Sequence, residues 1–413
     1  MRSDISPTFG TGQPTERHEI VVAGAGYAGL HTTLRLDARL GERHRDAGLT
    51  LLDRHDFHQV LTELPRVAGG ARSADDVRVP LRPVLGERVR FVQSVIVGFD
   101  FAARRVLTEA GPLPYTRLVL ALGSRPNDFG IPGLVERALT LWSVEDARKV
   151  LAAVDTQSAA AVGEPDRNEQ SRRMTVVIGG GGATGVELAG ELAEELPDLA
   201  RRHGLDPRLC RVVLVDAGPT ILAGSSPALI DKANGLLHDL GVEVRTNAQI
   251  ARVTEDGFVL KGGDTVRGGV FVWAGGIKAP EIVSGSGLPI GNNGRVKVDQ
   301  YLRVLDRPEV YVAGDLASIT NPATGRVYAP TAQIALSEGE TVANNLLAEV
   351  QGTALEAFHY TDRGFVVSVG PRSGVADVAG RAIGGRVAHL LKDAIEWEYR
   401  QSVKHMRGWS PTV

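Results

Sequence analysis

The sequence predicts an α/β fold built from two Rossmann-type dinucleotide-binding domains, followed by a C-terminal interface region. Three observations carry this prediction. A glycine-rich turn in "IVVAGAGYAGL" (Ile20–Leu30) returns in changed form in "VVIGGGGATGVEL" (Val176–Leu188). Each turn stands between an apolar run typical of a strand and a longer run typical of a helix. The chain has 413 residues, which is too long for one ordinary domain.

Composition narrows the class of protein. Hydrophobic residues make up 43% and charged residues 23%, as in a soluble globular protein, and a net charge of −3 gives no reason to expect nucleic acid as a partner. The single cysteine, Cys210, excludes an internal disulfide and fits a reducing, cytoplasmic compartment. No apolar run approaches the roughly 18 residues of a membrane span. We expect residues 1–17 to be a flexible tail rather than a signal peptide.

The first glycine turn follows an apolar strand and precedes a helix. In G-x-G-x-x-G, the first glycine permits the tight turn, the second lets a pyrophosphate approach the backbone, and the third lets the helix pack on the strand. The pyrophosphate would lie at the positive helix N-terminus. The next strand, "LTLLD", ends at an acid that can accept hydrogen bonds from an adenosine ribose. The residues of this predicted site are Gly24, Gly26, Gly29 and Asp53.

The second turn repeats the pattern. Strand "MTVVI" leads into the turn and the helix "VELAGELAEELPDL", and the next strand, "RVVLVD", ends at an acid. The residues of this site are Gly180, Gly182, Gly185 and Asp216. Two complete dinucleotide folds in one chain predict two bound dinucleotides, held face to face. The polar stretch Asp155–Arg173, before the first strand of this domain, is predicted to be a flexible surface loop. No metal site is expected.

Three further strands end in small residues. "YTRLVLALGS" reaches Gly123, "GGVFVWAGG" reaches Gly275, and "RPEVYVAGDLA" ends in Gly314 and Asp315. With the two turns, these segments make the chain resemble the flavoproteins with two dinucleotide-binding domains. In that superfamily the aspartate of the late "GD" accepts from the ribityl chain of FAD. The resemblance implies that the first turn and Asp315 bind FAD and that the second turn binds NAD(P)H.

The resemblance also implies a domain organisation. FAD would be bound by residues 18–142 and 271–350, with the NAD(P)H domain, 143–270, inserted between them. Residues 351–413 would form the C-terminal interface region. Disulfide reductases of the superfamily need a redox pair of cysteines near the flavin. With Cys210 alone, we expect electrons to pass from the flavin directly to an external acceptor.

Finer motifs resemble the type II NADH dehydrogenases, which are single-subunit NADH:quinone oxidoreductases. "GGGATGVELAGEL" (Gly180–Leu192) is similar to their nicotinamide-side motif, and "FHQVLTELPRVAGG" (Phe57–Gly70) to their segment after the ribose-binding acid. "APTAQIALSEGETVANNL" (Ala329–Leu346) is similar to their flavin- and quinone-facing segment, with its Ala-Gln pair at Ala332 and Gln333. The family often has a further glutamine near Ser337 or Glu338, and this chain departs from that pattern.

Two residues are expected to act directly in the reaction. Glu187, in the first turn of the second helix, would orient the nicotinamide carboxamide or ribose, or alternatively serve as a partner of the helix dipole. Gln333 would donate to the flavin O2 or to a quinone carbonyl, stabilising charge that develops on reduction. Asp216 should favour NADH over NADPH because a carboxylate repels a 2′-phosphate. Arg211 and Arg245 are in sequence range to soften that preference.

The segment "GGRVAHLLKDAIEWEYRQSVKHMRGW" has helical spacing of apolar residues. These are Val387, Leu390, Leu391, Ala394, Ile395, Tyr399, Val403 and Met406. Basic residues lie among them, namely Arg386, Lys392, Arg400, Lys404 and Arg407, with Trp397 and Trp409 as interface anchors. Such a helix suits a membrane surface, which would place the protein on the inner face of the cell membrane. It equally suits a homodimer interface, and the acids Asp393, Glu396 and Glu398 weaken its cationic face.

Three functions are compatible with these features. The first is a FAD-dependent enzyme that passes hydride from NADH through flavin to a quinone. The second is a soluble NAD(P)H-dependent flavin enzyme that reduces a quinone-like metabolite in a biosynthetic pathway. The third is a flavin-based redox sensor, which would show a long-lived reduced flavin–NAD complex and little quinone turnover. Membrane flotation and a panel of quinones would separate the first two.

Overall fold

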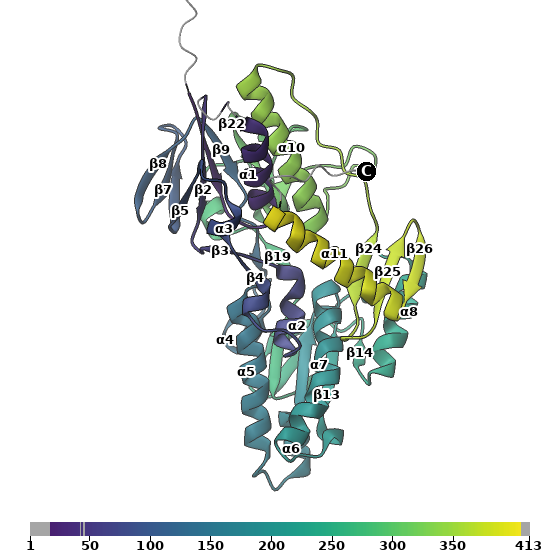
Figure 1. Cartoon of the computed structure of the whole chain (residues 1–413). Helices are drawn as coiled ribbons and strands as arrows, with labels where there is room; N and C mark the ends of the chain where they lie inside the picture. The colour runs from purple at the N-terminus through teal and green to yellow at the C-terminus, as the bar shows by residue number, and fades with distance from the viewer. Residues whose placement is uncertain (1–16, 42, 44–45, 406–413) are drawn as a thin grey trace, which may run out of the picture.

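The computed structural model describes residues 17–41, 43 and 46–405. Two parallel sheets organise the chain (Figure 1). The first has the order β21 (Arg303–Val304), β22 (Arg307–Val312), β9 (Arg117–Leu120), β1 (His18–Ala23), β2 (Ala47–Asp53) and β5 (Val89–Gln93), with β21 antiparallel. The second has the order β11 (Leu139–Thr140), β18 (Val270–Trp273), β12 (Thr175–Gly179), β13 (Arg211–Val215) and β14 (Glu243–Arg245). The predicted tail lies almost entirely outside the described residues.

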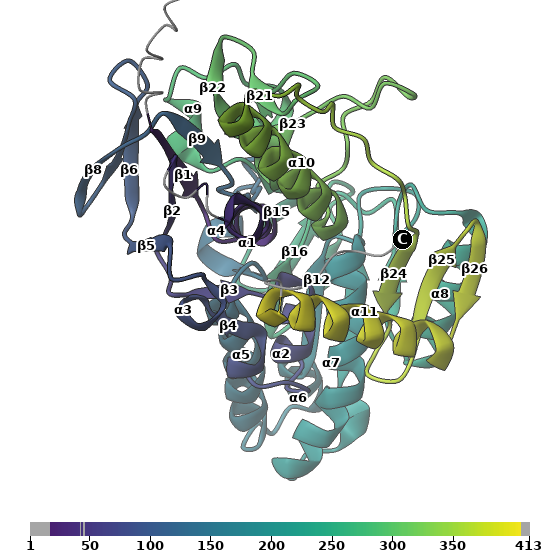
Figure 2. The ribbon, with the colours of Figure 1, turned by 45° about the horizontal axis from the view of Figure 1, so that its top comes forward.

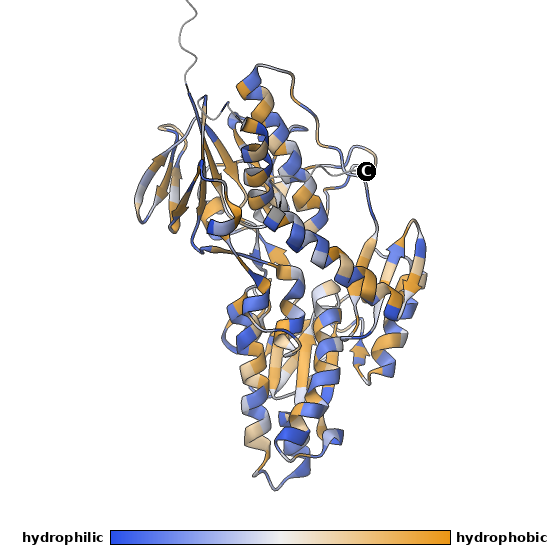
Figure 3. Ribbon diagram, in the orientation of Figure 1, coloured by the Kyte–Doolittle hydropathy of each residue, from blue (hydrophilic) through white to orange (hydrophobic). Residues whose placement is uncertain are grey.

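The two sheets are covered in the same way. Helix α1 (Tyr27–Leu40) packs on β1 and β2, and α10 (Ala332–Gln351) packs on α1. Helix α7 (Ala183–Arg202) packs on β12 and β13, α5 (Val144–Ala161) on β11 and β18, and α8 (Pro227–Asp239) on β14. Alternating strand residues are buried toward opposite faces, Val22 with the helices and Val21 away from them. In Figure 3 the strands of the second sheet are largely apolar, whereas hydrophilic residues are frequent on the helices that cover them.

Antiparallel sheets lie on the faces that these helices leave uncovered. The first of them comprises β6 (Ile96–Asp100), β7 (Arg105–Thr108) and β8 (Gly111–Pro114), and its residues share a core with Val21. The other comprises β15 (Ile250–Val253), β16 (Gly257–Leu260) and β17 (Thr265–Arg267), and shares a core with Val177. The two Rossmann-type domains thus share one architecture, a parallel sheet with helices on one face and an antiparallel sheet on the other.

Short elements complete these domains. The two-stranded sheets are β3 (Phe57–Gln59) with β4 (Arg78–Pro80), β10 (Arg125–Pro126) with β19 (Ile277–Lys278), and β20 (Val296–Lys297) with β23 (Ala317–Ser318). The short helices are α2 (Leu64–Ala68), α3 (Leu81–Val84), α4 (Leu134–Arg137), α6 (Arg167–Arg173) and α9 (Glu281–Ser284). The second sheet takes in β11 and all of β18, and therefore reaches slightly beyond the predicted limits 143–270 on both sides.

The stretch Asp155–Arg173, predicted to be a flexible loop, is mostly helical. Ser143 caps α5 by accepting from the Asp146 amide at 3.0 Å, and the helix continues to Ala161. Asp166 then caps α6. The prediction was wrong because Val154, Ser158 and Ala161 form a buried helical stripe of small residues that polarity alone does not reveal.

The C-terminal region forms a third unit. It contains a sheet of β24 (Phe365–Ser368), β25 (Gly374–Val378) and β26 (Arg381–Gly384), followed by α11 (Arg386–His405). Strand β24 contacts α7, and β25 and β26 contact α8. Helix α11 packs on β24 and β25 and crosses between the two Rossmann-type domains (Figures 1 and 2). Among the described residues, no helix is both long and apolar enough to span a membrane.

Candidate functional site

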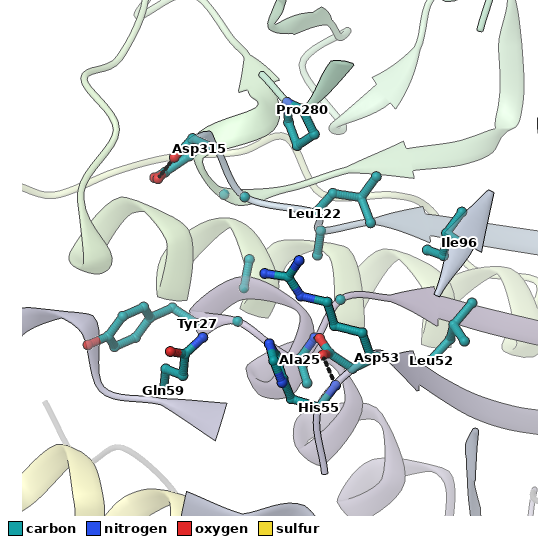
Figure 4. A pocket seen from close by; sticks show the side chains of 18 of the residues that line it. Ala25, Tyr27, Leu52, Asp53, His55, Gln59, Ile96, Leu122, Pro280 and Asp315 are labelled. Atoms are coloured by element: carbon teal, nitrogen blue, oxygen red, sulfur yellow. Dashed lines mark hydrogen bonds between the residues drawn. The ribbon is translucent and has the colours of Figure 1, made fainter. Parts of the chain in front are cut away.

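A pocket lies at the carboxyl edge of the first sheet, where β1, β2, β9 and β22 end (Figure 4). It brings together residues that are far apart in the sequence and that the sequence predicted for the first site. Those that line it are Gly24, Gly26, Asp53, Gly123, Gly314 and Asp315. Parallel strands present their carboxyl ends at one edge, and ligands of this fold bind there.

The three glycines of the first loop have different surroundings. Gly24 has φ +107°, and a Cβ on it would lie 2.2 Å from the Ala121 carbonyl oxygen. A Cβ on Gly29 would lie 1.9 Å from the Gly24 oxygen, whereas one on Gly26 would meet nothing within 4 Å. The fold therefore needs glycine at 24 and 29, while Gly26 leaves open space beside the N-terminus of α1, where an anion would bind.

Two acids face this pocket from different elements (Figure 4). Asp53 accepts from the amides of Ala25 at 2.6 Å and His55 at 2.8 Å, and its carboxylate has further lone pairs for a ribose hydroxyl. Asp315 accepts from the Ser124 hydroxyl at 2.7 Å, and burial raises the pKa of Asp315. Ser124 was not predicted as a site residue, although it directly follows Gly123.

Glu338 supports the turn that carries Asp315. It is fully buried, and its Oε2 accepts from the Gly314 amide at 2.5 Å. Burial raises the pKa of Glu338 to about 8, and its Oε1 has no hydrogen-bond partner among the described residues. The sequence marked this position only as a departure from a family pattern, so its contact with Gly314 was not predicted.

Two positively charged side chains also belong to the lining of this pocket. Arg54 and Arg125 line it, and burial together with the neighbouring Arg54 lowers the pKa of Arg125. Two guanidinium groups and a helix N-terminus suit a doubly charged diphosphate. With a ribose-binding acid and the open space at Gly26, the residues present fit FAD.

The second glycine loop repeats this geometry on the second sheet. Gly180 has φ +116°, and its Cβ would lie 2.4 Å from the Ala274 oxygen and 2.7 Å from the Gly275 Cα. A Cβ on Gly185 would lie 1.8 Å from the Gly180 oxygen, and one on Gly182 would meet nothing within 4 Å. The structure therefore brings Gly275 against the loop, as the first site brings in the segment ending at Gly123.

Asp216 occupies the same position as Asp53. Its Oδ2 accepts from the Gly181 amide at 2.6 Å and its Oδ1 from the Gly218 amide at 2.7 Å. The two nearby arginines predicted to matter both pair with Glu243, Arg211 at 2.6 Å and Arg245 at 2.5 Å. The second site therefore has the loop and the acid that a second dinucleotide requires.

The predicted catalytic residue Glu187 lies between α7 and the C-terminal unit. It is 6% exposed, and its Oε1 accepts from the Ser368 amide at 3.1 Å and from the Lys392 ammonium. Lys392 also donates to the Ser368 hydroxyl at 3.3 Å. The structure thus fixes Glu187 through α11 and β24, and it does not place Glu187 in the lining of the first pocket.

Gln333 is the second residue of α10, directly after Ala332. Its Oε1 accepts from the Tyr360 hydroxyl at 2.9 Å, and its Nε2 donates to the Gly364 carbonyl at 3.3 Å. An amide has two N–H groups, and the bond to Gly364 uses one of them. Neither Ala332 nor Gln333 lines the first pocket, although Ala335, one turn into α10, does.

Helix α11 is amphipathic with its polar side inward. Lys392 is 4% and Glu396 6% exposed, whereas Val387 and Leu390 are each 63% and Trp397 65% exposed. The membrane-surface alternative counted Lys392 among the basic residues of a cationic helix, but Lys392 does not lie on an outer cationic face, because Glu187 and Glu396 pair with it inside the protein. Met406, Arg407 and Trp409 lie outside the described residues.

The inward side of α11 joins a buried ionic network with α2 and its preceding turn. Arg66 pairs with Asp393 at 2.6 Å and with Glu396 at 3.5 Å, and Glu63 pairs with Arg400. Burial raises the pKa of Glu396 to about 8. No group of residues able to hold a metal ion occurs in the described part of the chain.

Comparisons with known proteins agree with this geometry. Residues 18–339 match the pyridine nucleotide-disulphide oxidoreductase family. A type II NADH:quinone oxidoreductase of Staphylococcus haemolyticus (strain JCSC1435) is 32% identical over 385 residues, covering 92% of this chain and 94% of that protein. One from Staphylococcus aureus (strain NCTC 8325 / PS 47) is 33% identical over 387 residues, with the same coverage.

Solved structures show the same fold. NDH2 from Plasmodium falciparum in complex with NADH matches with a TM-score of 0.84 at 18% identity, over 95% of this chain and 96% of that one. The sulfide:quinone oxidoreductase of Aquifex aeolicus matches with a TM-score of 0.76 at 20% identity, over 94% and 91%. On the family match and the two staphylococcal relatives, this chain belongs to the pyridine nucleotide-disulphide oxidoreductase family and, within it, to the type II NADH:quinone oxidoreductases.

Proposed function

We propose that this protein oxidises NADH with FAD and passes the electrons to a quinone, without a redox-active disulfide. The observation that carries the proposal is the pair of complete glycine-loop and acid sites, one on each parallel sheet. FAD, when bound, supplies hydride acceptance from NADH and electron donation to the acceptor. The overall reaction is NADH + H⁺ + quinone → NAD⁺ + quinol.

The position of Cys210 agrees with a reaction that needs no thiol. Cys210 directly precedes β13, at the amino edge of the second sheet, whereas both glycine loops lie at carboxyl edges. Burial raises the pKa of its thiol to about 11, which disfavours the reactive thiolate. It is also the single cysteine of the chain.

NADH, rather than NADPH, is the expected donor. A carboxylate at the position of Asp216 accepts a hydrogen bond from a ribose 2′-hydroxyl and repels a 2′-phosphate. The ion pairs of Glu243 with Arg211 and Arg245 reduce the positive charge that either arginine would offer to that phosphate.

Glu187 and Gln333 are proposed to act on the two sides of the reaction. Glu187, held through Oε1 by Lys392 and Ser368, would orient the nicotinamide end of NADH. Gln333, held by Tyr360 and Gly364, would offer its second amide N–H to the flavin or to a quinone carbonyl. In both cases the protein contributes a preorganised polar group rather than covalent chemistry.

Stopped-flow measurement of the two half-reactions of Gln333→Leu tests the acceptor side. We expect reoxidation of reduced enzyme by a quinone to slow by about 10- to 150-fold, because a hydrogen bond to developing charge contributes about 1.5–3 kcal/mol. Reduction by NADH should change much less. Tyr360→Phe is the control, since it removes only the hydroxyl that holds Gln333 and should have a smaller effect. Equal slowing of both half-reactions would mean that Gln333 is a structural residue.

Steady-state assays with menaquinone, ubiquinone and naphthoquinone analogues identify the acceptor class. Rapid NADH oxidation with a quinone supports the proposal. A long-lived reduced enzyme that none of the quinones reoxidises would contradict it and would favour a sensor.

We further propose that the outward side of α11 contacts the membrane surface on the cytoplasmic side, where hydrophobic quinones reside. The exposed apolar residues Val387, Leu390 and Trp397 recur on one side of the helix. Such a stripe is typical of a helix that lies in the plane of the membrane interface. The exposed Arg386 and Lys404 near the ends of α11 add attraction to anionic lipid, whereas the exposed Glu398 opposes it.

Flotation with anionic vesicles tests this contact. The wild-type protein should float with vesicles, and Leu390→Ser/Trp397→Ser should remain in the dense fraction while keeping its activity with a water-soluble quinone. The same variant is to be sized in lipid-free solution. If the wild type fails to float but is a dimer that this variant dissociates, the stripe is a homodimer interface and the membrane proposal is wrong.

A further inference from the structure

Three aromatic rings from distant segments meet next to the first glycine loop. Tyr27 is the first residue of α1, His58 lies in β3, and Tyr399 lies in α11. The ring centroid of Tyr27 is 5.1 Å from that of His58 and 5.0 Å from that of Tyr399. His58 is 1% exposed. The C-terminal helix therefore contacts the residue that follows the glycine predicted to meet the pyrophosphate.

A hydrogen-bond relay runs through this cluster. The Nδ1 of His58 lies 2.8 Å from the carbonyl oxygen of Ala25, and its Nε2 lies 2.8 Å from the Tyr399 hydroxyl. A carbonyl oxygen only accepts, so Nδ1 carries the proton and Nε2 is the acceptor. The Tyr399 hydroxyl therefore donates to His58. Burial lowers the pKa of His58 to about 4, so the imidazole stays neutral at physiological pH and the relay has one direction.

The relay acts on the peptide bond between Ala25 and Gly26. The Ala25 amide donates to Asp53 at 2.6 Å and its carbonyl accepts from His58, so both sides of Ala25 are fixed. Because a trans peptide is planar, its N–H points opposite to its C=O. Holding the Ala25 carbonyl toward His58 therefore aims the Gly26 N–H the other way, and Gly26 lines the pocket.

The second glycine loop offers an internal comparison. Its corresponding carbonyl, that of Gly181, accepts from the backbone amide of Leu222 at 2.8 Å. The same peptide is thus fixed in both loops, in the second by a nearby backbone segment of the same domain. In the first loop the fixing group is a side chain that in turn depends on α11. This contact therefore links the C-terminal helix to the first glycine loop, whereas the corresponding carbonyl of the second loop is fixed without it.

We propose that His58 and Tyr399 are positioning residues for the FAD diphosphate, through which α11 sets the direction of the Gly26 amide. The inference rests on the proposed function in that the first loop binds FAD. Neither residue has to touch the reacting atoms. The expected consequence is that loss of the relay weakens FAD binding more than it weakens the fold.

Titration of the FAD-free full-length chain with FAD, followed by flavin fluorescence, tests the proposal. Tyr399→Phe keeps the ring and removes the hydroxyl, and it should raise the Kd for FAD about 3- to 10-fold, the effect of one hydrogen bond. His58→Leu should raise the Kd further. His58→Asn, whose amide can donate in place of Nδ1, should recover part of the affinity. Tyr311→Phe is the matched control, because it removes a buried hydroxyl that bonds Glu349 at 2.9 Å instead.

Thermal unfolding with and without FAD separates positioning from a scaffold role. The relay variants should lower the unfolding midpoint of the FAD-bound protein more than that of the FAD-free protein, whereas Tyr311→Phe should lower both equally. Equal lowering in Tyr399→Phe with an unchanged Kd would overturn the proposal. If Tyr399→Phe does not fold, the comparison of His58→Leu with His58→Asn decides, and equal affinities would overturn it. Absence of FAD binding by the wild type would instead refute the proposed function.

Discussion

The glycines of the two loops divide into those that the fold requires and those that a ligand requires, and substitutions can separate the two. Gly26→Val places a side chain where no protein atom lies within 4 Å, at φ −71° and ψ −170°, a backbone conformation that valine adopts readily. Loss of glycine at a helix N-cap costs about 0.5–1 kcal/mol, and reduced freedom of the unfolded chain offsets a similar amount. We expect the FAD-free stability to change by less than about 1 kcal/mol.

Gly29→Ala should behave in the opposite way. Its Cβ would lie 1.9 Å from the Gly24 oxygen, about 1.4 Å short of the roughly 3.3 Å of a close C···O contact. Since backbone rather than a flexible side chain must move, the cost should reach about 3 kcal/mol or more. For a cooperative unit of domain size, that lowers the unfolding midpoint by roughly 6–12 °C.

The assay combines thermal unfolding of FAD-free protein with flavin absorbance of purified protein. Gly26→Val should be folded and colourless, and Gly29→Ala should be destabilised. Gly182→Val should remain yellow and lose NADH binding, because it is the equivalent open position of the second loop. A yellow Gly26→Val protein with normal FAD content would refute the assignment of the first loop. Loss of FAD from Gly182→Val alone would mean that the two nucleotide sites are exchanged.

Three further outcomes follow from contacts described above. Asp216→Ala should raise the Michaelis constant for NADH and reduce the preference for NADH over NADPH, while the amount of bound FAD stays unchanged. Loss of FAD with normal NADH kinetics would contradict the assignment of the two sites. In urea unfolding of the FAD-free protein, the free energy of unfolding should fall as the pH rises from about 6.5 to 8. The pKa values of Glu338 and Glu396 are raised from 4.5 to about 8, so the folded protein keeps these two protons over a range in which the unfolded chain has lost them, and this contribution to stability disappears as the pH approaches 8. The depressed pKa of His58, about 4, makes stability rise with pH only up to about 6.5, so a flat or rising profile above that pH would disprove the carboxyl assignment. Lys392→Met should lower the free energy of unfolding by about 3–5 kcal/mol in the same experiment, because it leaves the buried Glu187 carboxylate without its cation. A change below about 1 kcal/mol would show that Lys392 does not compensate the charge of Glu187.

The parts of the fold that could be predicted are those in which one residue type satisfies a local requirement. A backbone at φ +107° or +116°, with a carbonyl oxygen less than 2.5 Å from the Cβ position, admits only glycine. Both loops could therefore be recognised in the sequence. The acids at the ends of β2 and β13 could also be recognised, because each satisfies a local requirement by accepting a backbone amide of the neighbouring glycine loop.

The parts that could not be predicted depend on pairs of residues far apart in the chain. The spacing of apolar residues predicted helix α11, but it did not reveal that the polar side is buried. That depends on Glu63, Arg66 and Glu187, which lie hundreds of residues earlier in the sequence. The bond from Glu338 to Gly314 and the relay from Tyr399 to Ala25 likewise need the tertiary structure before they can be recognised.

The inward polarity of α11 separates two kinds of evolutionary constraint on one helix. On the outer side, Val387, Leu390 and Trp397 can exchange with other apolar residues one at a time, since any of them supplies hydrophobic area. On the inner side, a substitution at Lys392 requires a matching substitution at Glu187, so we expect these two positions to change together during evolution. The helix is therefore not a detachable anchor. Truncation before Arg386 would leave buried charges without partners, and a form of the protein that no longer associates with lipid is better sought by polar substitutions on the outer side.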